Sequence, residues 1–279
     1  MGSGIKLMKN VCIFMSVYGK DCPVALDAAL DSICNQTYPN IEIFICKDGQ
    51  LTEALEDIIL KFVRTSIDVT VLSNPENIGL AKSLNKIIDH VLSREHIPDF
   101  FARMDSDDIA YPQRIEEQIL YMEENRLDVC GSYCREFGAT YALDKKMVPT
   151  LNNDIVNMAV SRCPFVHPTV VFHAEVFISG VRYPENTVFS EDMALWFILI
   201  KEGFSLGNIP KVLLDYRLNE DTVKRRLGVA KGFSEFKLRW KYMISSKQYS
   251  FANVTKLCLR LPFHILPVYL VKILYKYAR

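Results

Sequence analysis

The sequence lacks the short motifs that most directly identify nucleotide enzymes and disulfide or metal scaffolds. It has no CxxC pair among its eight cysteines, no GxGxxG after its first apolar run and no GxxxxGK(S/T). The cysteines are scattered among apolar runs, which is typical of buried thiols in a reducing compartment. The missing glycine motifs argue against a dinucleotide dehydrogenase and against a P-loop NTPase.

Long uncharged apolar segments are missing as well. No run of about 20 residues is apolar enough and sufficiently free of charge to cross a bilayer. No secretory signal is visible near the N-terminus. We therefore expect a cytoplasmic protein without a transmembrane helix.

Charge is balanced in total but not along the chain. The 279 residues are 49% hydrophobic and 24% charged, which predicts a globular protein with ample core. Lys+Arg and Asp+Glu both number 33, yet thirteen of the basic residues and one acid, Glu235, lie after residue 223. A basic tail on an acidic body indicates that the tail meets an anionic partner.

Apolar runs alternate with segments of helical spacing through the first 108 residues. We expect strands at 11–18, 41–46, 69–72 and 100–104, and helices at 23–36, 52–64 and 80–92, with Asp21 as the cap of the first helix. This alternation predicts an α/β fold with a mostly parallel central sheet and flanking helices. Ligands bind beyond the carboxyl ends of the strands in such sheets.

Polar residues follow each of these four strands. They are Ser16 and Tyr18, then Asp48, then Asn77 and Gly79, and finally Asp105 and Asp107. The last strand runs into Asp105-Ser106-Asp107-Asp108, three carboxylates that repel one another unless a cation lies among them. Carboxylate oxygens suit Mg2+ or Mn2+. A solvated acidic turn before the next helix is the alternative.

The second half contains a further pair of acids. We expect a helix at 113–125, a strand at 128–133, loop at 135–155, a loop feeding a strand at 163–172 and a strand near 209–214. Ser190-Glu191-Asp192 opens an apolar helix. Helix capping and the helix dipole explain acids at that position without any catalytic role, so both interpretations stay open.

Taken together, these residues resemble the family 2 glycosyltransferases. The resemblance rests on Ser16-Val17-Tyr18, Asp48-Gly49, Asn77-Ile78-Gly79-Leu80-Ala81 with Asn85, the Asp105–Asp108 run and Ser190-Glu191-Asp192, and it covers residues 10–220. It implies a GT-A fold and an inverting transfer of sugar from a nucleotide-sugar. The subtype is similar to bacterial enzymes that build O-antigen or capsular repeat units.

The resemblance implies roles on the nucleotide side. Asp48 would bind the uracil or ribose, Ser16, Val17 and Tyr18 would line the base pocket, and the Asn77–Gly79 loop would close over the nucleotide. Asp107 would be the main ligand of a divalent metal, with Asp105 near the metal and ribose. Arg103, Ser106 and Arg217 are further candidates to contact the nucleotide-sugar, with ordinary ion pairing as the alternative for Arg103.

On the acceptor side, Asp192 would be the general base, because an inverting transfer needs one carboxylate to take the proton of the attacking hydroxyl. Glu191 would orient the acceptor or Asp192. His167 and Trp196 are acceptor-side candidates, with a structural histidine and a core tryptophan as alternatives. A histidine is common in the family two residues after the arginine, but here Asn219 follows Arg217, which leaves the remaining metal ligand open.

We divide the chain into a GT-A catalytic domain at 1–222, with a nucleotide-binding half at 8–108 and an acceptor half at 109–222, and a tail at 223–279. In the tail we expect a basic amphipathic helix at 229–248 and an apolar stretch at 254–277 that Pro262 and Pro267 interrupt. This composition favours contact with an anionic membrane surface at the inner face of a bacterial membrane. Packing on the body with a solvated basic face is the alternative.

The predicted activity is transfer of a hexose or N-acetylhexosamine from a UDP-sugar to a polyprenyl-diphosphate-linked saccharide, with a β-glycosidic product and Mn2+ or Mg2+ as cofactor. Another glycan or glycolipid acceptor, a sugar nucleotidyltransferase and a non-catalytic sugar-nucleotide-binding protein are the alternatives. We expect no nucleic-acid partner, since no nucleic-acid-binding fold accompanies the basic charge.

Overall fold

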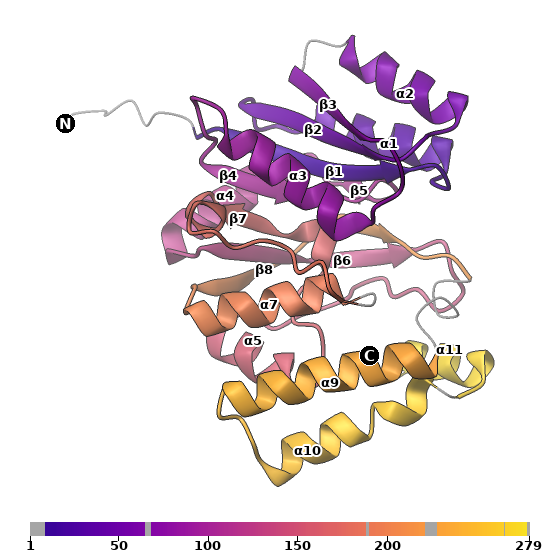
Figure 1. Ribbon diagram of the computed structural model, residues 1–279, viewed down its shortest axis with the longest axis vertical. Helices are drawn as coiled ribbons and strands as arrows, with labels where there is room; N and C mark the ends of the chain where they lie inside the picture. Colours follow the sequence, from indigo (N-terminus) through magenta and orange to yellow (C-terminus); the bar gives the residue numbers. More distant parts are fainter. Residues whose placement is uncertain (1–8, 65–67, 188–189, 221–227, 265, 278–279) are drawn as a thin grey trace, which may run out of the picture.

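An eight-stranded mixed sheet forms the centre of the molecule (Figure 1). The structure, a computed structural model, describes residues 9–64, 68–187, 190–220, 228–264 and 266–277. The strands are β1 (Val11–Tyr18), β2 (Ile41–Asp48), β3 (Asp68–Asn74), β4 (Phe100–Arg103), β5 (Ile109–Ala110), β6 (Val129–Phe137), β7 (Val171–His173) and β8 (Leu206–Arg217). Their order is β3-β2-β1-β4-β7-β6-β8-β5.

The predicted parallel arrangement is confirmed for the first half of the chain. Strand β1 pairs in parallel with β2 and β4, and β2 pairs in parallel with β3. Strands β6 and β8 are also parallel, whereas β7 runs antiparallel to β4 and β6, and β5 runs antiparallel to β8. The strand β5 was not expected, and neither was the antiparallel direction of β7, whose strand was expected near 172.

Helices cover both faces of the sheet. They are α1 (Pro23–Cys34), α2 (Glu53–Val63), α3 (Leu80–Leu92), α4 (Arg114–Asn125), α5 (Asn152–Ala159), α6 (Glu175–Ile178) and α7 (Glu191–Glu202), with the 3-10 turn η1 at His167–Thr169. Along β1, Ile13 and Met15 pack with α1, α2 and α4 residues, while Phe14 packs with α3 and α7 residues. A strand buried on both faces needs apolar side chains at every position, which explains the continuous run.

The prediction of a loop over 135–155 is wrong at its two ends, whereas residues 138–151 lie outside the helices and strands, as expected. Strand β6 continues to Phe137 through irregular pairing with β8, and α5 begins at Asn152. Polar side chains are tolerated in this stretch because they have partners. Arg135, for example, forms an ion pair with Asp215, the residue opposite it on β8.

The C-terminal region is helical, as expected. We call α9 (Val229–Ser245), α10 (Phe251–Cys258), the 3-10 turn η2 (Leu261–His264) and α11 (Val268–Tyr277) the tail helices. Pro262 lies in η2 and Pro267 directly precedes α11, so the apolar stretch is interrupted at both prolines. Helices α9 and α10 lie at the end of the molecule opposite α2 and β3 (Figure 1).

The sequence predicts no transmembrane helix and a domain boundary before the tail. No helix in the described ranges is long and apolar enough to cross a membrane. The proposed boundary between 222 and 223, and the basic residues Lys224, Arg225 and Arg226, lie outside the described residues.

Candidate active site

The carboxyl ends of β1, β2 and β4 meet at one edge of the sheet. Tyr18 at the end of β1 lies opposite Asp48 at the end of β2, and Phe14 of β1 lies opposite Arg103 at the end of β4. The parallel register therefore places the end of β1, with Ser16 and Tyr18, and the acidic loop, residues 105–108, at the edge where parallel sheets bind ligands.

Asp48 holds the loop that follows β3. Its Oδ1 accepts hydrogen bonds from Asn74 Nδ2 at 3.1 Å and from the Ile78 amide at 2.9 Å, and its Oδ2 accepts from the Gly79 amide at 3.0 Å. The residue is buried. Asp48 therefore fixes the shape of the Asn77–Gly79 loop. Its contact with uracil or ribose stays a prediction.

Two glycines allow the tight approach of these loops. Gly79 has φ +94° and Gly49 has φ +87°, both in the left-handed region that L side chains rarely adopt. A Cβ on Gly49 would lie 2.7 Å from the Asn77 amide nitrogen. Asp48 therefore holds the Asn77–Gly79 loop by hydrogen bonds, and Gly49 leaves room for this loop because it has no side chain.

The end of β1 is tied to the acidic loop by Asp21. Its Oδ2 accepts from the Tyr18 amide at 3.1 Å and from Ser106 Oγ at 2.8 Å. We expected Ser16, Val17 and Tyr18 to line a base pocket, but the side chain of Val17 lies in the core, so Val17 can contribute only its backbone. Ser16 and Tyr18 are half-buried.

Sequence analysis missed Asp21, which resembled a helix cap. In the described structure the N-cap of α1 is Cys22, without a side-chain hydrogen bond, and Pro23 opens the helix. Burial raises the pKa of the Asp21 carboxyl, although its hydrogen bonds from Ser106 and Tyr18 partly offset this effect. An acid in the turn directly after a strand at the ligand edge is the signal that could have identified it.

The acidic loop is anchored by two arginines. Arg103 is buried and forms an ion pair with Asp105. Arg217 donates from its backbone amide to Asp108 Oδ1 at 2.7 Å and from Nε to the Asp107 carbonyl at 2.7 Å. Its guanidinium also lies over the Phe137 ring, 4.5 Å from the centroid. Both arginines therefore support the loop from within the protein.

Among the described residues, the loop keeps one carboxylate oxygen without a hydrogen-bond partner. Asp108 is 0% exposed, and its Oδ2 has no hydrogen-bond partner among the described residues. Burial, followed by the negative charges of Asp105 and Asp107, raises the pKa of Asp108 well above its usual range. Such a cluster would gain from an added cation.

A divalent cation fits this chemistry. The acidic loop offers carboxylate oxygens, which Mg2+ and Mn2+ prefer, and one of those oxygens is buried without a partner. In the described part of the chain no three His, Cys, Asp or Glu side chains are grouped to enclose a metal. The protein would therefore supply only part of the shell, and water and substrate oxygens would complete it.

The two acids of the acceptor side begin α7. Asp192 Oδ1 accepts from the Met193 amide at 2.6 Å, and Cys163 Sγ lies 3.8 Å from Asp192 Oδ2 in donor geometry. Ser190 makes no capping hydrogen bond in this structure. Burial raises the pKa of Glu191, and the charges of Asp192 and Asp105 raise it further. The acidic loop and the start of α7 therefore lie within electrostatic reach of each other.

His167 lies against the Tyr183 side chain. Its Nε2 is 3.0 Å from the Tyr183 hydroxyl. Burial and then the positive charge of Arg103 lower the pKa of His167 well below its usual range, so the ring is neutral at physiological pH. Its contact with an acceptor stays a prediction, while its hydrogen bond to Tyr183 matches the structural alternative.

The prediction that Trp196 offers a face to a sugar is wrong. The side chain is 0% exposed and packs on Phe165 and Phe172, with centroid distances of 4.8 and 6.1 Å. The apolar helix that presents Glu191 and Asp192 turns this ring into the core. Trp196 therefore holds α7 against the sheet.

Asn85 connects α3 to the segment that precedes α7. Its Oδ1 accepts from the Tyr183 amide at 2.9 Å, and its Nδ2 donates to the Tyr183 carbonyl at 2.9 Å and to Glu185 Oε1 at 3.0 Å. Asn85 lies on α3, directly after the Asn77–Gly79 loop. Sequence analysis quoted Asn85 as part of the resemblance but did not predict this role or that of Tyr183.

The chain has the GT-A fold. Staphylococcus aureus TarS 1-349 in complex with UDP-GlcNAc superposes with a TM-score of 0.66 at 14% identity, over 92% of this chain and 71% of that chain. The mannosyltransferase PcManGT from Pyrobaculum calidifontis, in complex with GDP-Man and Mn2+, superposes with a TM-score of 0.63 at 13% identity, over 93% and 74%.

Sequence comparison then gives the family. The model of Glycosyl transferase family 2 matches residues 12–170. The amylovoran biosynthesis glycosyltransferase AmsE of Erwinia amylovora is 31% identical over 269 residues, covering 96% of this chain and 98% of AmsE. The UDP-Gal:alpha-D-GlcNAc-diphosphoundecaprenol beta-1,3-galactosyltransferase of Escherichia coli is 31% identical over 257 residues, covering 89% and 90%. The chain belongs to glycosyl transferase family 2, as its motifs predicted.

Proposed function

We propose that this family 2 glycosyltransferase moves a hexose or N-acetylhexosamine from a UDP-sugar to a saccharide carried on a polyprenyl diphosphate, with inversion to a β-glycosidic bond. The observation that carries the proposal is the acidic loop, which follows β4 at the carboxyl edge of the parallel strands and contains a buried Asp108 oxygen without a hydrogen-bond partner among the described residues. The Escherichia coli relative, named for UDP-Gal and a diphosphoundecaprenol acceptor, supports this choice of substrates.

The acidic loop would hold the donor diphosphate through a divalent metal, with Asp107 as the main ligand and Asp105 beside it. Mn2+ or Mg2+ would supply Lewis-acid stabilisation of the leaving nucleoside diphosphate. The Mn2+ complex of the mannosyltransferase neighbour supports a metal in this fold. Arg103 and Arg217 hold the loop in place, and Asp48 shapes the Asn77–Gly79 loop over the nucleotide.

Asp192 would act as the general base. The acceptor oxygen forms a bond to the anomeric carbon while the bond from that carbon to the diphosphate oxygen breaks, and the hydroxyl proton passes to the Asp192 carboxylate. The Met193 amide and the Cys163 thiol orient this carboxylate. Glu191, whose pKa is raised, would contact the acceptor as a neighbouring carboxyl group.

The tail helices would bring the enzyme to a lipid-linked acceptor on the cytoplasmic face of the membrane. Helix α9 buries one stripe that includes Arg239, Tyr242 and Met243. A second stripe at helical spacing leaves apolar side chains exposed, including Phe233 at 63% and Ile244 at 51%. Exposed lysines follow along the helix, so this face matches an anionic lipid surface in both apolarity and charge.

A transfer assay tests the reaction. Wild-type protein is incubated with Mn2+, a panel of UDP-sugars and synthetic GlcNAc- or GalNAc-diphosphate-lipid, and we expect one UDP-sugar to give product. Asp192→Asn should lower the transfer rate by about 10²–10⁴-fold while UDP binding is retained. Near-wild-type turnover would remove Asp192 from the role of base. Release of pyrophosphate would indicate a nucleotidyltransferase, and binding without turnover a non-catalytic protein.

Vesicle sedimentation tests the membrane contact separately. Vesicles with phosphatidylglycerol should bind wild-type protein at low salt, and Phe233→Glu with Trp240→Glu should abolish this binding. Leu60→Glu is the matched control, because Leu60 is 47% exposed on α2 at the other end of the molecule. Equal loss of binding in the control, or none in the double variant, would contradict the assignment.

A further inference from the structure

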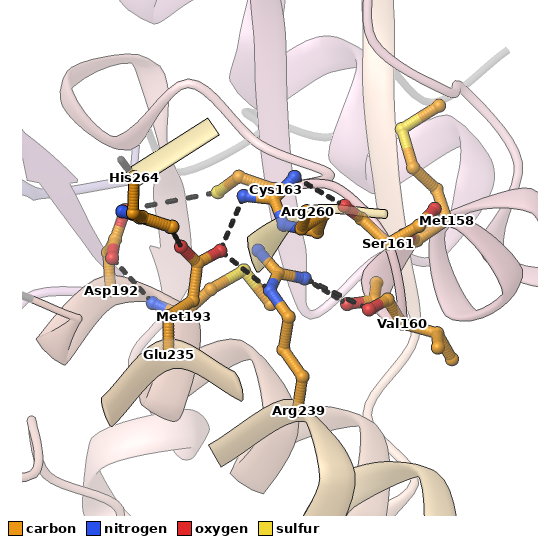
Figure 2. Close-up of polar contacts among 11 residues, drawn as sticks. Met158, Val160, Ser161, Cys163, Asp192, Met193, Glu235, Arg239, Arg260 and His264 are labelled. Carbon is orange, nitrogen blue, oxygen red and sulfur yellow. Dashed lines mark hydrogen bonds and ion pairs between the residues drawn. The ribbon is translucent and has the colours of Figure 1, made fainter. Parts of the chain in front are cut away.

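A half-buried charge cluster around the buried Arg239 joins the tail helices to the catalytic body (Figure 2). The Glu235 carboxylate on α9 accepts from Arg239 Nε at 2.7 Å and from Arg260 Nη2 at 2.5 Å, and His264 Nε2 lies 3.3 Å from its other oxygen. Burial acts to raise the pKa of Glu235, but the hydrogen bond from His264 and the charges of the two arginines outweigh it and hold that pKa well below its usual range. Glu235 is therefore the charged centre of the cluster.

Both arginines extend from Glu235 to the catalytic body. Arg239 Nη1 donates to the Ala159 carbonyl at 2.7 Å and to the Val160 carbonyl at 3.3 Å, and Arg260 Nη1 donates to the Ser161 carbonyl at 2.6 Å. These carbonyls lie at the C-terminal end of α5, where backbone carbonyls lack partners within the helix and cations are favoured. The tail thereby caps α5.

The capped segment leads directly to Asp192. Cys163 follows Ser161 by two residues, and its thiol lies 3.3 Å from the Phe165 carbonyl and 3.8 Å from Asp192 Oδ2. Burial and the charge of Asp192 raise the pKa of Cys163 to about 12, so the group remains a protonated donor. Figure 2 shows Cys163 between Arg260 and Asp192.

A second contact joins the same two parts of the molecule. Phe197 on α7 stacks on Tyr242 on α9, with ring centroids 3.9 Å apart and planes inclined by 11°. Helix α7 carries Asp192 in its first turn. The helix with the exposed apolar stripe therefore contacts the helix of the proposed base and, through Arg239, the segment that bears Cys163.

We propose that Glu235 is a positioning residue for the transfer reaction. By holding Arg239 and Arg260 on the end of α5, it fixes residues 159–163 and, through the Cys163 thiol, the orientation of the Asp192 carboxylate. The role assigned to Asp192 rests on the proposed function, whereas the mechanical link from the tail to α7 does not. A tail that served only as a membrane anchor would need no such link.

The test compares Glu235→Gln with Glu220→Gln. Glu220 forms a different contact between the body and the tail, an ion pair with Lys272 of α11. For Glu235→Gln we expect the kcat of sugar transfer to fall about tenfold or more, since small displacements of a catalytic group cost this much. The KM for UDP-sugar and the Kd for UDP should stay within about twofold of wild type, because the nucleotide side is untouched. Glu220→Gln should change none of these values.

Hydrogen exchange gives a readout independent of activity. Amides in 159–163 and 191–196 should exchange faster in Glu235→Gln than in wild type and in Glu220→Gln. Unchanged exchange at 191–196, or an unchanged transfer kcat, would overturn the proposal. If the wild-type protein transfers no sugar but exchange rises as expected, the proposed function fails while the link between tail and α7 stands.

A second variant guards against misfolding. Glu235→Gln leaves the buried Arg239 without a countercharge, so the variant could fail to fold. Arg260→Met keeps the Glu235–Arg239 pair and removes the donors to the Ser161 carbonyl and to one Glu235 oxygen. The same pattern of lower transfer kcat, retained UDP affinity and faster exchange at 191–196 is expected. Loss of stability with none of these changes would show that the cluster serves only the fold.

Discussion

The acidic loop and the Glu235 cluster place similar groups in opposite electrostatic situations. Asp108 is fully buried, accepts one backbone hydrogen bond and lies beside Asp105 and Asp107, and its pKa is raised. Glu235 lies among two guanidinium groups and an imidazole, and its pKa is lowered. The sign of the shift follows from the neighbouring charges, since both carboxylates lose solvent.

This difference separates a site that is complete within the chain from one that is not. A buried carboxylate with its countercharges in place is a structural element, whereas one with a deficit of positive charge marks a place where an external cation would bind. The acidic loop therefore points to chemistry, and the tail cluster points to mechanical support. Four variants of the candidate site and of the Glu235 cluster should lose activity or stability to different extents.

Asp107→Ala should have the largest effect. Removing the main proposed metal ligand should lower sugar transfer by about 10²–10³-fold, because charge on the leaving diphosphate is no longer neutralised. Thermal unfolding should show that Mn2+ raises the Tm of wild-type protein and that EDTA reverses this rise. An equal Mn2+-dependent rise in Asp107→Ala would contradict the assignment.

Arg239→Met tests whether the tail cluster is structural. Arg239 is buried, and its loss leaves part of the Glu235 charge and two backbone carbonyls without a donor. We expect a loss of about 3 kcal/mol of unfolding free energy, measured by urea denaturation. Arg135→Met is the control, since the Arg135–Asp215 pair has a half-exposed arginine and should change the denaturation midpoint little.

Gly49→Ala tests how the nucleotide loop is shaped. Its Cβ would meet the Asn77 amide at 2.7 Å, whereas a Cβ on Gly203, at a similar φ of +81°, would meet no atom within 4 Å. Gly203→Ala should therefore cost about 1–2 kcal/mol of unfolding free energy through backbone strain alone. Gly49→Ala should cost more and weaken UDP binding in calorimetry. Equal effects in both variants would show that the contact with Asn77 is unimportant.

The acid response of Glu235 should be the smallest effect. A carboxyl group with a lowered pKa stabilises the fold above its unfolded pKa, near 4.5, and loses that contribution as pH falls towards the folded value. The Tm difference between wild-type protein and Glu235→Gln should thus be largest near neutral pH and shrink below about pH 4.5. A difference that is constant with pH would mean that charge plays no part in the cluster.

Much of the nucleotide-binding half could be predicted because each strand there is a continuous apolar run bounded by polar turns. Helix α3 has the predicted bounds, 80–92, and the strands differ by one or two residues at most of their ends. The predicted loop at 135–155 began too early, because polar Arg135 and Glu136 interrupt the apolar pattern although both belong to β6. Their ion-pair partners come from residues distant in sequence or across a turn, so no local pattern identifies them.

The candidate site was predictable in its acids and less so in its supports. Asp105, Asp107, Asp108, Glu191 and Asp192 lie at element ends and could be identified from the sequence. Asp21 resembled a helix cap, and Trp196 resembled a sugar platform, because exposure is not visible in a sequence. The Glu235 cluster was not predicted, since Arg260 lies beyond the next helix and no local pattern joins it to Glu235.

The contact between Asn85 and the backbone of Tyr183 has a consequence for protein engineering. Asn85 binds both the amide and the carbonyl of Tyr183, so one side chain takes the place of a neighbouring strand. A chimera that joined this donor-binding half to the acceptor half of another enzyme would need a main-chain segment able to meet that amide. Acceptor specificity is therefore more readily exchanged by grafting loops than by swapping whole halves.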